Sequence, residues 1–364
     1  MRERISWNVV VPLLALVTLA LTWGTEPGPS LAALEAVVLI GAVLAAVHHA
    51  EVVAHRVGEP FGSLVLATAV TVIELALIIE LMASGGNEAE TLARDTAFAA
   101  LMITTNGIAG LSLLLGSHRY GVTLFNPHGS GAALATLTTL ATLSLVLPSF
   151  TTTRGRQEFS PGQLVFAAVA SLLLYLLFVF TQTVRHRDFF LPVAQRGQQG
   201  SMFDEESHAE PPSQAAALRS VALLAGALVA VVGLAEQESP AVEKLVSVAG
   251  FPHSFVGVVI AGLVLLPETL AAVRAARQGR IQTSLNLAYG SAMASIGLTI
   301  PGIALASIWI KGPLLLGLGP TQLVLFALTV VISMLTVIPG RATRLQGEVH
   351  LVLLAAFVFL AIVP

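Results

Sequence analysis

The chain has 364 residues, of which 55% are hydrophobic and only 11% are charged, and its formal net charge is −3. A soluble domain of this length needs a polar shell, so the composition places the chain in a membrane and leaves no room for a separate soluble domain. The near-neutral charge gives no sign of a nucleic-acid partner, and the lack of cysteine excludes disulfides, thiolate metal sites and cysteine nucleophiles.

Apolar segments follow one another along the whole chain, separated by charge clusters and Gly/Pro-rich breaks. About 20 apolar residues cross the hydrocarbon core of a bilayer, and the breaks delimit eleven such spans. They are predicted at residues 7–23, 30–53, 60–84, 95–115, 131–150, 162–184, 216–235, 254–274, 284–310, 321–338 and 348–363. We therefore expect an all-α polytopic membrane protein with about eleven transmembrane helices.

The first span resembles the apolar part of a signal peptide. Residues 16–23 lack the small-residue pattern of a cleavage site, however, so we interpret the span as a retained helix. With the N-terminus in the cytoplasm, thirteen of the eighteen Arg and Lys residues fall in inner loops and five in outer loops. This is the bias of the positive-inside rule, and it supports both the cytoplasmic N-terminus and the number of spans.

One long polar stretch interrupts this pattern, from Arg185 to Ser213, and its acidic, Gly- and Pro-containing composition predicts a flexible cytoplasmic linker. The predicted organisation is a leading helix (1–29), a first five-helix repeat (30–184), the acidic linker (185–215) and a second five-helix repeat (216–364). Because five is odd, the second block enters the membrane from the opposite side. Two such blocks are what an inverted-repeat transporter requires.

Each block carries a glutamate at the same depth. Glu74 lies fifteen residues after Glu59, and Glu268 lies fifteen residues after His253, where the respective spans begin. Each is then about 22 Å from its own membrane face, and both lie near the midplane because the spans run in opposite directions. A lone acid in a membrane helix can pair with a basic residue that fixes packing, but no basic residue lies near the middle of any predicted span. An exposed carboxylate there costs about 2.5 kcal/mol or more, so we interpret the pair as an ion or proton site.

Oxygen-bearing groups surround both glutamates. Thr71 lies nearly on the helix face of Glu74, and Pro267 prevents a hydrogen bond to the Leu263 carbonyl, which leaves that oxygen available. The next span of each block adds Thr104, Thr105 and Asn106 in the first, and Ser284, Asn286 and Ser291 in the second. Oxygen ligands suit Ca²⁺, Na⁺ or K⁺ rather than zinc or copper. For the small polar residues between 284 and 297, close helix packing is an equally good explanation.

These residues also carry a family resemblance. Pro267-Glu268 followed by Asn286-Leu-Ala-Tyr-Gly-Ser291-Ala, together with Thr71-Val-Ile-Glu74, resembles the α-repeats of the cation/Ca²⁺ antiporter superfamily. The motifs Gly58-Glu-Pro-Phe-Gly62, Val70-Thr-Val-Ile-Glu74, Arg94-Asp-Thr96 and Ser112-Leu-Leu-Leu-Gly116 look like those of bacterial calcium/sodium–proton antiporters of the ChaA type.

The resemblance implies one helix before two inverted five-helix repeats, in a bacterial inner membrane, and export of Ca²⁺, Na⁺ or K⁺ in exchange for protons without a cofactor. It matches Glu74 and Glu268 to the acids of the two repeats and Asn286 to the amide of the second. Thr105-Asn106-Gly107 is the nearest match to the amide signature of the first repeat. Our hypothesis is that Glu74 and Glu268, as shared metal and proton ligands, bind either the cation or protons during alternating access.

Other features suggest alternative functions. His48, His49, Glu51 and His55 cluster at the cytoplasmic end of the second span, where headgroup-level polar residues are the commoner explanation and a pH sensor is a secondary hypothesis. The alternatives to antiport are a passive cation channel and an intramembrane enzyme with a metal held by His48, Glu51 and His55. Glu80 lies on a different helix face from Glu74 and is expected at the outer mouth.

Overall fold

The computed structural model describes residues 7–25, 28–57, 61–84, 90–155, 157–195, 212–309 and 313–364, and these are almost entirely helical. The α-helices are α1 (Trp7–Thr22), α2 (Pro29–Val57), α3 (Phe61–Ser84), α4 (Leu92–Met102), α5 (Ala109–Tyr120), α6 (Pro127–Ala141), α7 (Pro161–Phe180), α8 (Gln214–Val248), α9 (Phe255–Val264), α10 (Leu266–Arg277), α11 (Ile281–Ala306), α12 (Pro320–Val337) and α13 (Arg344–Ile362). The π-helical turns η2 (Ile103–Ile108), η3 (Thr142–Val146) and η5 (Thr181–Arg185), and the 3₁₀ turns η4 (Leu147–Ser149) and η6 (Arg187–Phe190), extend or connect them.

These helices join into eleven rods within the described residues, because α4, η2 and α5 are continuous and α9 and α10 form one bent rod. Eight of the rods are long and apolar enough to cross a membrane, and the bent pair is a ninth. The predicted all-α polytopic fold is therefore confirmed, with each rod at one of the predicted spans.

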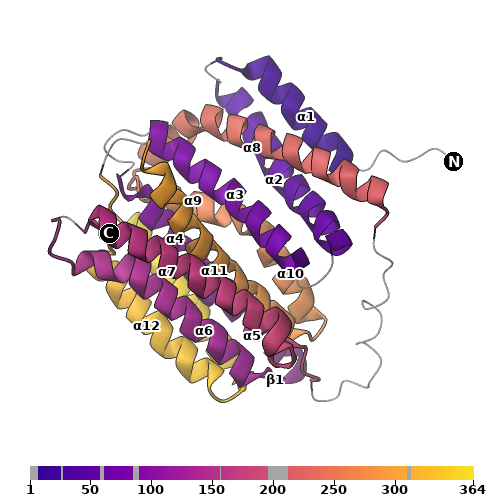
Figure 1. Cartoon of the computed structure of the whole chain (residues 1–364), viewed down its shortest axis with the longest axis vertical. Helices are drawn as coiled ribbons and strands as arrows, with labels where there is room; N and C mark the ends of the chain where they lie inside the picture. The colour runs from indigo at the N-terminus through magenta and orange to yellow at the C-terminus, as the bar shows by residue number, and fades with distance from the viewer. Residues whose placement is uncertain are drawn as a thin grey trace.

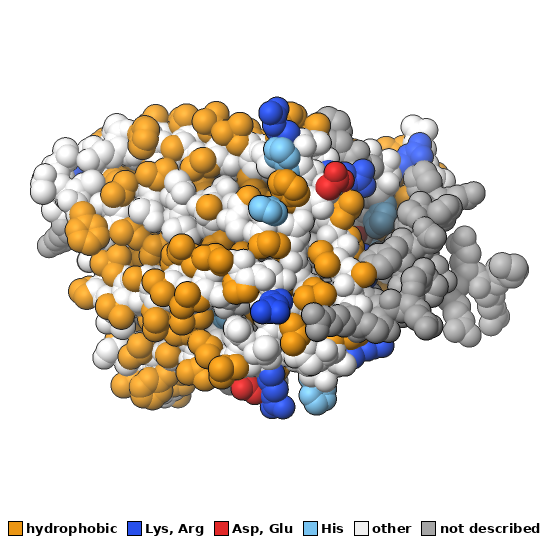
Figure 2. All heavy atoms as spheres, turned by 90° about the horizontal axis from the view of Figure 1, so that it is seen from below, with side chains coloured by type: hydrophobic (Ala, Val, Ile, Leu, Met, Phe, Trp, Pro, Cys, Tyr) orange, Lys and Arg blue, Asp and Glu red, His pale blue; other side chains and the backbone are white. Residues whose placement is uncertain are grey.

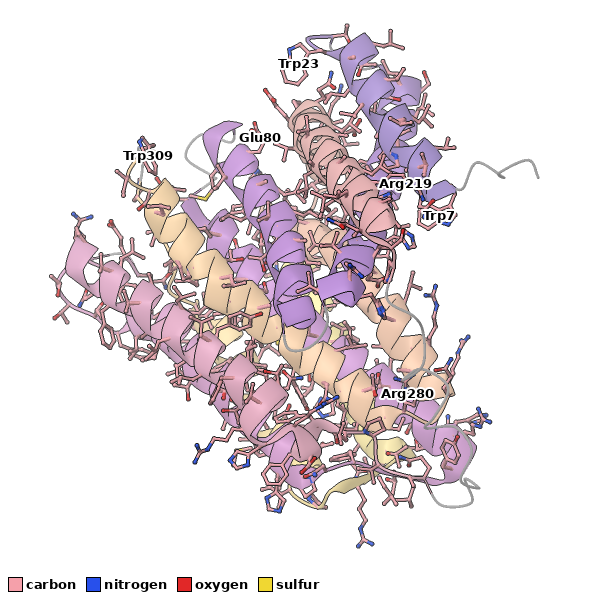
Figure 3. The ribbon with its side chains drawn as sticks, turned by 45° about the vertical axis from the view of Figure 1, so that its right-hand side comes forward. Trp7, Trp23, Glu80, Arg219, Arg280 and Trp309 are labelled. Atoms are coloured by element: carbon pink, nitrogen blue, oxygen red, sulfur yellow. The ribbon has the colours of Figure 1, made fainter. Side chains whose placement is uncertain are left out.

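The two ends of the bundle differ in their polar side chains. Trp23, Glu80 and Trp309 lie toward one end, which we call the acidic end, while Arg219 and Arg280 lie toward the opposite, basic end (Figure 3). Tryptophan at the ends of membrane helices is typical of the headgroup level. Between the ends, hydrophobic side chains cover much of the outer surface, as the face in Figure 2 shows.

The helices enclose two apolar cores. One lies among α1, α2 and α8 and includes the adjoining faces of α3 and α9, and the other joins α4 to α7 with α10 to α13. Figure 1 shows α1, α2 and α8 grouped on one side of the molecule. The two cores therefore meet along α3 and the α9–α10 rod, which carry the two glutamates.

Contacts between rods occur in matched pairs. The helix α7 packs on α11 and α13 packs on α5, while α3 packs on α11 and α10 packs on α5. If each helix of the first predicted block is replaced by its counterpart in the second, the α7–α11 contact becomes the α13–α5 contact, and the α3–α11 contact becomes the α10–α5 contact. The block boundaries at 30–184 and 216–364 themselves stay a prediction.

The eighth predicted span is interrupted close to Pro267. The chain bends by 54° between α9 and α10, at Leu265, two residues before the proline that cannot donate an intrahelical hydrogen bond. By contrast, α3 runs unbroken from Phe61 to Ser84 through Glu74.

Two features differ from the sequence-based expectations. The helix α8 continues to Val248, well past its predicted end, with Pro240 inside it. A small antiparallel pair, β1 (Val122–Leu124) with β2 (Arg341–Thr343), joins loops of the two blocks. Such three-residue strands carry too little pattern to be detected in a sequence.

The predicted flexible linker begins with a packed segment. Phe190 and Gln195 are buried. The Gln195 side chain accepts a hydrogen bond from Leu124 N (2.8 Å) and donates one to Leu124 O (2.8 Å). Phe190 and Gln195 thus anchor the start of the linker to the bundle, while residues 185–189 between α7 and Phe190 are exposed, and the prediction of a flexible linker stays a prediction. Residues 196–211, with their acidic run, lie outside the described residues.

Candidate functional site

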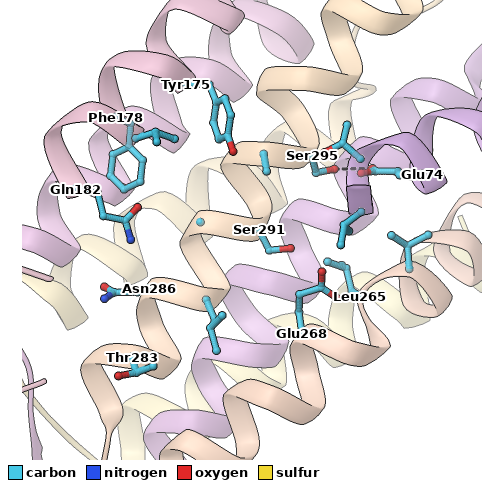
Figure 4. A pocket seen from close by; sticks show the side chains of 17 residues that line it. Glu74, Tyr175, Phe178, Gln182, Leu265, Glu268, Thr283, Asn286, Ser291 and Ser295 are labelled. Atoms are coloured by element: carbon cyan, nitrogen blue, oxygen red, sulfur yellow. Dashed lines mark hydrogen bonds between the residues drawn. The ribbon is translucent and has the colours of Figure 1, made fainter. Parts of the chain in front are cut away.

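A cavity of about 360 Å³ lies between α3, α7, α11 and the break between α9 and α10 (Figure 4). Its polar lining residues are Thr71, Glu74, Tyr175, Gln182, Glu268, Thr283, Asn286, Ser291 and Ser295. Glu74 and Ser295 stand near the middle of their helices, whereas Gln182 and Thr283 stand near the basic end. The cavity thus extends from the middle of the bundle toward the basic end.

Glu74 is held in a fixed position. Its side chain is only 3% exposed, and Ser295 Oγ on α11 donates a hydrogen bond of 2.5 Å to its Oε1. Figure 4 shows this bond crossing from α11 to α3. A buried carboxylate needs such donors, because the cost of leaving it unsatisfied exceeds that for a neutral group.

Glu268 is placed differently, in the first turn of α10 directly after the break. Its Oε2 is buried and has no hydrogen-bond partner in the described chain. A helix N-terminus favours negative charge because its first N–H groups point away from the helix. The break therefore supports an anionic side chain while leaving one of its oxygens open to a ligand.

The two carboxyl groups influence each other across the cavity. Glu74 is close enough to Glu268 for their charges to repel. The lining residues offer a cation carboxylate, hydroxyl and amide oxygens. Hard cations with oxygen preference, or protons, are the ligands that relieve such repulsion. The arrangement can thus bind a cation between the carboxylates or hold protons on them.

The helix α11 supplies a polar stripe to the same cavity. Ser291 and Ser295 are four residues apart and line it one turn after the other. Asn286, one turn nearer the basic end, donates to the Phe190 carbonyl (2.7 Å) and accepts from Gln282 (2.8 Å). Asn286 consequently connects the cavity wall to the packed segment that follows α7.

Asn106 is predicted at the ion site, but the structure does not bring it, or its neighbours Thr104 and Thr105, to the cavity. It is fully buried in η2, donates to Thr329 Oγ1 (3.0 Å), and its Oδ1 lies 2.9 Å from His350 Nδ1. Its neighbours Thr104 and Thr105 donate to carbonyls of their own helix. Five predicted residues, Thr71, Glu74, Glu268, Asn286 and Ser291, do line the cavity.

The histidine cluster of the second span ties helices together. His49 contacts Asn8 O (2.7 Å) and Ser220 Oγ (3.2 Å), and His48 contacts the Asn8 side chain (2.7 Å). Among the described residues, no three His, Asp or Glu side chains are grouped to hold a metal ion. The histidines join α1 and α8 to α2.

Sequence reasoning missed several residues of the cavity, above all Ser295. Its signal was present in the four-residue spacing of Ser291, Ser295 and Thr299, which places hydroxyls along one face of α11. Tyr175 and Gln182 gave no such signal, because only the packing of α7 against α11 brings them to the cavity. Ser284 bonds to Ser112 Oγ and the Ala272 carbonyl, which fits the packing explanation.

Comparison with known proteins adds a family and a fold. The family model for sodium/calcium exchanger proteins matches residues 28–184 and 219–363. The y4hA protein of Sinorhizobium fredii (strain NBRC 101917 / NGR234), to which ionic transport is ascribed, is 44% identical over 365 residues, 98% of this chain and 96% of that protein. The sodium-potassium/proton antiporter ChaA of Escherichia coli K12 is 33% identical over 353 residues, 96% of this chain and 94% of that protein.

Among solved structures, native YfkE has a TM-score of 0.72 at 17% identity, covering 98% of this chain and 99% of YfkE. At that identity the likeness bears on the fold alone.

Proposed function

Because the chain belongs to the sodium/calcium exchanger protein family and its relatives are ion transporters, we propose that it is a cation/proton antiporter whose Glu74 and Glu268 bind either a cation or protons. It exports Ca²⁺, Na⁺ or K⁺ across a bacterial inner membrane, with its N-terminus and basic end in the cytoplasm. Protons supplied at the acidic end move in the opposite direction.

One observation carries this proposal. Two carboxylates from oppositely directed helices face one cavity lined by oxygen ligands, and one of them keeps an oxygen without a partner. A structural acid pair would be satisfied by fixed donors, whereas a transport site must release its ligand. Competition between a cation and protons for the same oxygens couples the two fluxes.

The path on the acidic side is closed by apolar packing. Leu77 on α3 lies one turn from Glu74 toward the acidic end and belongs to the buried core among α2, α3, α8 and α9. Alternating access requires this contact to open while the basic side closes. The division of the molecule into two cores that meet along α3 and α9–α10 provides two bodies for such a motion.

The relatives indicate candidate cations. ChaA is named a sodium-potassium/proton antiporter, and the matching family model describes sodium/calcium exchanger proteins. Cavity oxygens from carboxylates, hydroxyls and an amide suit all three ions. Competition among Ca²⁺, Na⁺ and K⁺ in one flux assay ranks them.

The direct test uses purified protein in proteoliposomes. An imposed pH gradient is expected to drive uptake of one of these cations against its own gradient, and collapse of the pH gradient with a protonophore should abolish that uptake. Cation flux that follows only the cation's gradient and the membrane potential, unchanged by the protonophore at clamped potential, would contradict antiport and favour a passive channel.

A further inference from the structure

A second pair of buried carboxyl groups lies away from the cavity, where α2 and α8 pack together. Glu35 on α2 is fully buried, Glu238 on α8 is 5% exposed, and their carboxyl groups lie within hydrogen-bonding reach of each other. Glu35 stands in the second turn of α2, close to the helix end that begins at Pro29, so the pair lies toward the acidic end. Neither residue belongs to the cavity lining.

The pair lacks the partners that two carboxylates need. Both oxygens of Glu35 and Oε1 of Glu238 are buried and have no hydrogen-bond partner in the described chain. The adjacent amide, Gln237, is engaged with Thr22 on α1, accepting from Thr22 Oγ1 (3.2 Å) and donating to Thr22 O. Two buried, unpaired charges facing each other would strongly destabilise this packing.

Other charged groups do not relieve the pair. Helix α1 has no titratable residue between Trp7 and Thr22. On the remaining neighbouring elements, the described titratable groups toward this end are Glu80 on α3, Glu236 and Lys244 on α8, and His253 before α9. Of these, Glu80 and Glu236 act on each other, and it is Glu35 whose charge acts on Glu238.

An apolar layer separates the pair from the cavity. One turn from the carboxyl groups toward the basic end lie Val38 and Leu39 on α2 and Leu234 on α8, all buried in one core with Leu77 of α3. A proton on this pair therefore cannot pass freely to Glu74 or Glu268 while the layer is packed.

We propose that Glu35 and Glu238 form a second proton site, a carboxylic acid–carboxylate pair that holds one proton while α2 and α8 are packed at the acidic end. The shared proton supplies the donor that both groups lack. Opening of this end hydrates the pair and releases the proton, and loading it again favours closure. This last step rests on the proposed antiport, whereas the protonated pair itself does not.

Infrared spectroscopy of the purified full chain tests the proton directly. The E74Q/E268Q protein removes the cavity acids, so its protonated-carboxyl C=O band at neutral pH should come from the remaining buried acids. Adding E35Q or E238Q should each abolish that band, because the remaining acid then accepts a hydrogen bond from the glutamine amide and ionises. Adding E236Q, an exposed neighbour on α8, should leave it unchanged.

A band that survives both E35Q and E238Q, or that is absent from E74Q/E268Q throughout, would overturn the proposal. A band that appears only after chelators and removal of Na⁺ and K⁺ would also overturn it, in favour of a cation held by the pair. If one of the two glutamine variants does not yield folded protein, the other answers the question from the opposite helix.

Flux measurements then test the consequence for transport. In oriented proteoliposomes, E35Q and E238Q should retain exchange but shift its dependence on pH at the acidic-end face, because only protonation of Glu74 and Glu268 then contributes, whereas E236Q should match the unmodified protein. Absence of flux in the unmodified protein would contradict the antiporter without touching the infrared result. Unchanged pH dependence in both variants would refute the coupling of this pair to opening.

Discussion

Glu74 and Glu268 face the same cavity from two helices that reach it in opposite ways. The helix α3 passes Glu74 without interruption and fixes its carboxylate to Ser295, whereas the α9–α10 rod breaks beside Glu268 and leaves one of its oxygens unpartnered. The difference shows that the two blocks can bring the same chemical group, a carboxylate, to the cavity on different local backbone structures. In the mechanism that we propose, one carboxylate is oriented in advance, and the other is free to accept the ligand.

The largest effect is expected when either carboxylate is removed. Glu74→Gln and Glu268→Gln should each abolish proton-coupled flux in proteoliposomes while leaving a folded protein, because an amide keeps the shape but neither supplies charge nor takes up a proton. Glu236→Gln is the matched control and should transport normally. Wild-type flux in either cavity variant would show that the two carboxylates do not act as one site.

The second-largest effect is expected from removing the helix break beside Glu268, or from introducing one beside Glu74. Pro267→Ala restores a possible hydrogen bond to the Leu263 carbonyl, so the break should straighten and flux should fall by about tenfold, as for other changes to groups that orient an ion ligand. Pro240→Ala in α8 is the control. The reverse change, Ile73→Pro, should destabilise α3 by about 3 kcal/mol, measured by thermal unfolding in detergent. Full flux in Pro267→Ala would mean that the break is not needed.

A smaller effect is expected from releasing Glu74. Ser295→Ala removes the donor to Oε1, and such a bond between membrane helices contributes about 1 kcal/mol, so apparent cation affinity should change by about fivefold. Ser333→Ala is a suitable control, because this buried hydroxyl has no hydrogen-bond partner in the described chain. Equal affinities in the two variants, measured by calorimetry, would argue against a fixed Glu74.

The smallest effect should separate two amides that look alike in the sequence. Asn286→Ala should weaken cation binding by a few-fold, because Asn286 lines the cavity. Asn106→Ala should lower thermal stability without altering binding, since its partners are Thr329 and His350. A loss of cation affinity in Asn106→Ala would return it to the site.

The sequence was sufficient for the rods and for five of the nine polar residues that line the cavity. Hydropathy located the spans, and the unpaired acids and Pro267 pointed to the centre of the bundle. Asn106 is predicted because it lies in the span after Glu74 and is the nearest match to the amide signature of the first repeat, but its actual contacts depend on how α12 and α13 pack on η2, which no local pattern encodes. The Glu35–Glu238 pair escaped notice for the same reason, because Glu35 lies near the start of α2 and Glu238 lies past the predicted end of its span, so that both look solvated until α2 and α8 are brought together.

Cation-induced proton release from the detergent-solubilised protein tests the central claim most directly. If cation and protons compete for Glu74 and Glu268, cation binding must expel protons, and apparent affinity must fall as pH is lowered because protons then occupy the oxygens. Titrations with Ca²⁺, Na⁺ and K⁺ across a pH series should show both effects, and E74Q/E268Q should show neither. Affinity independent of pH, with no protons released, would contradict the shared site and leave the two glutamates as fixed-charge ligands of a passive cation pathway.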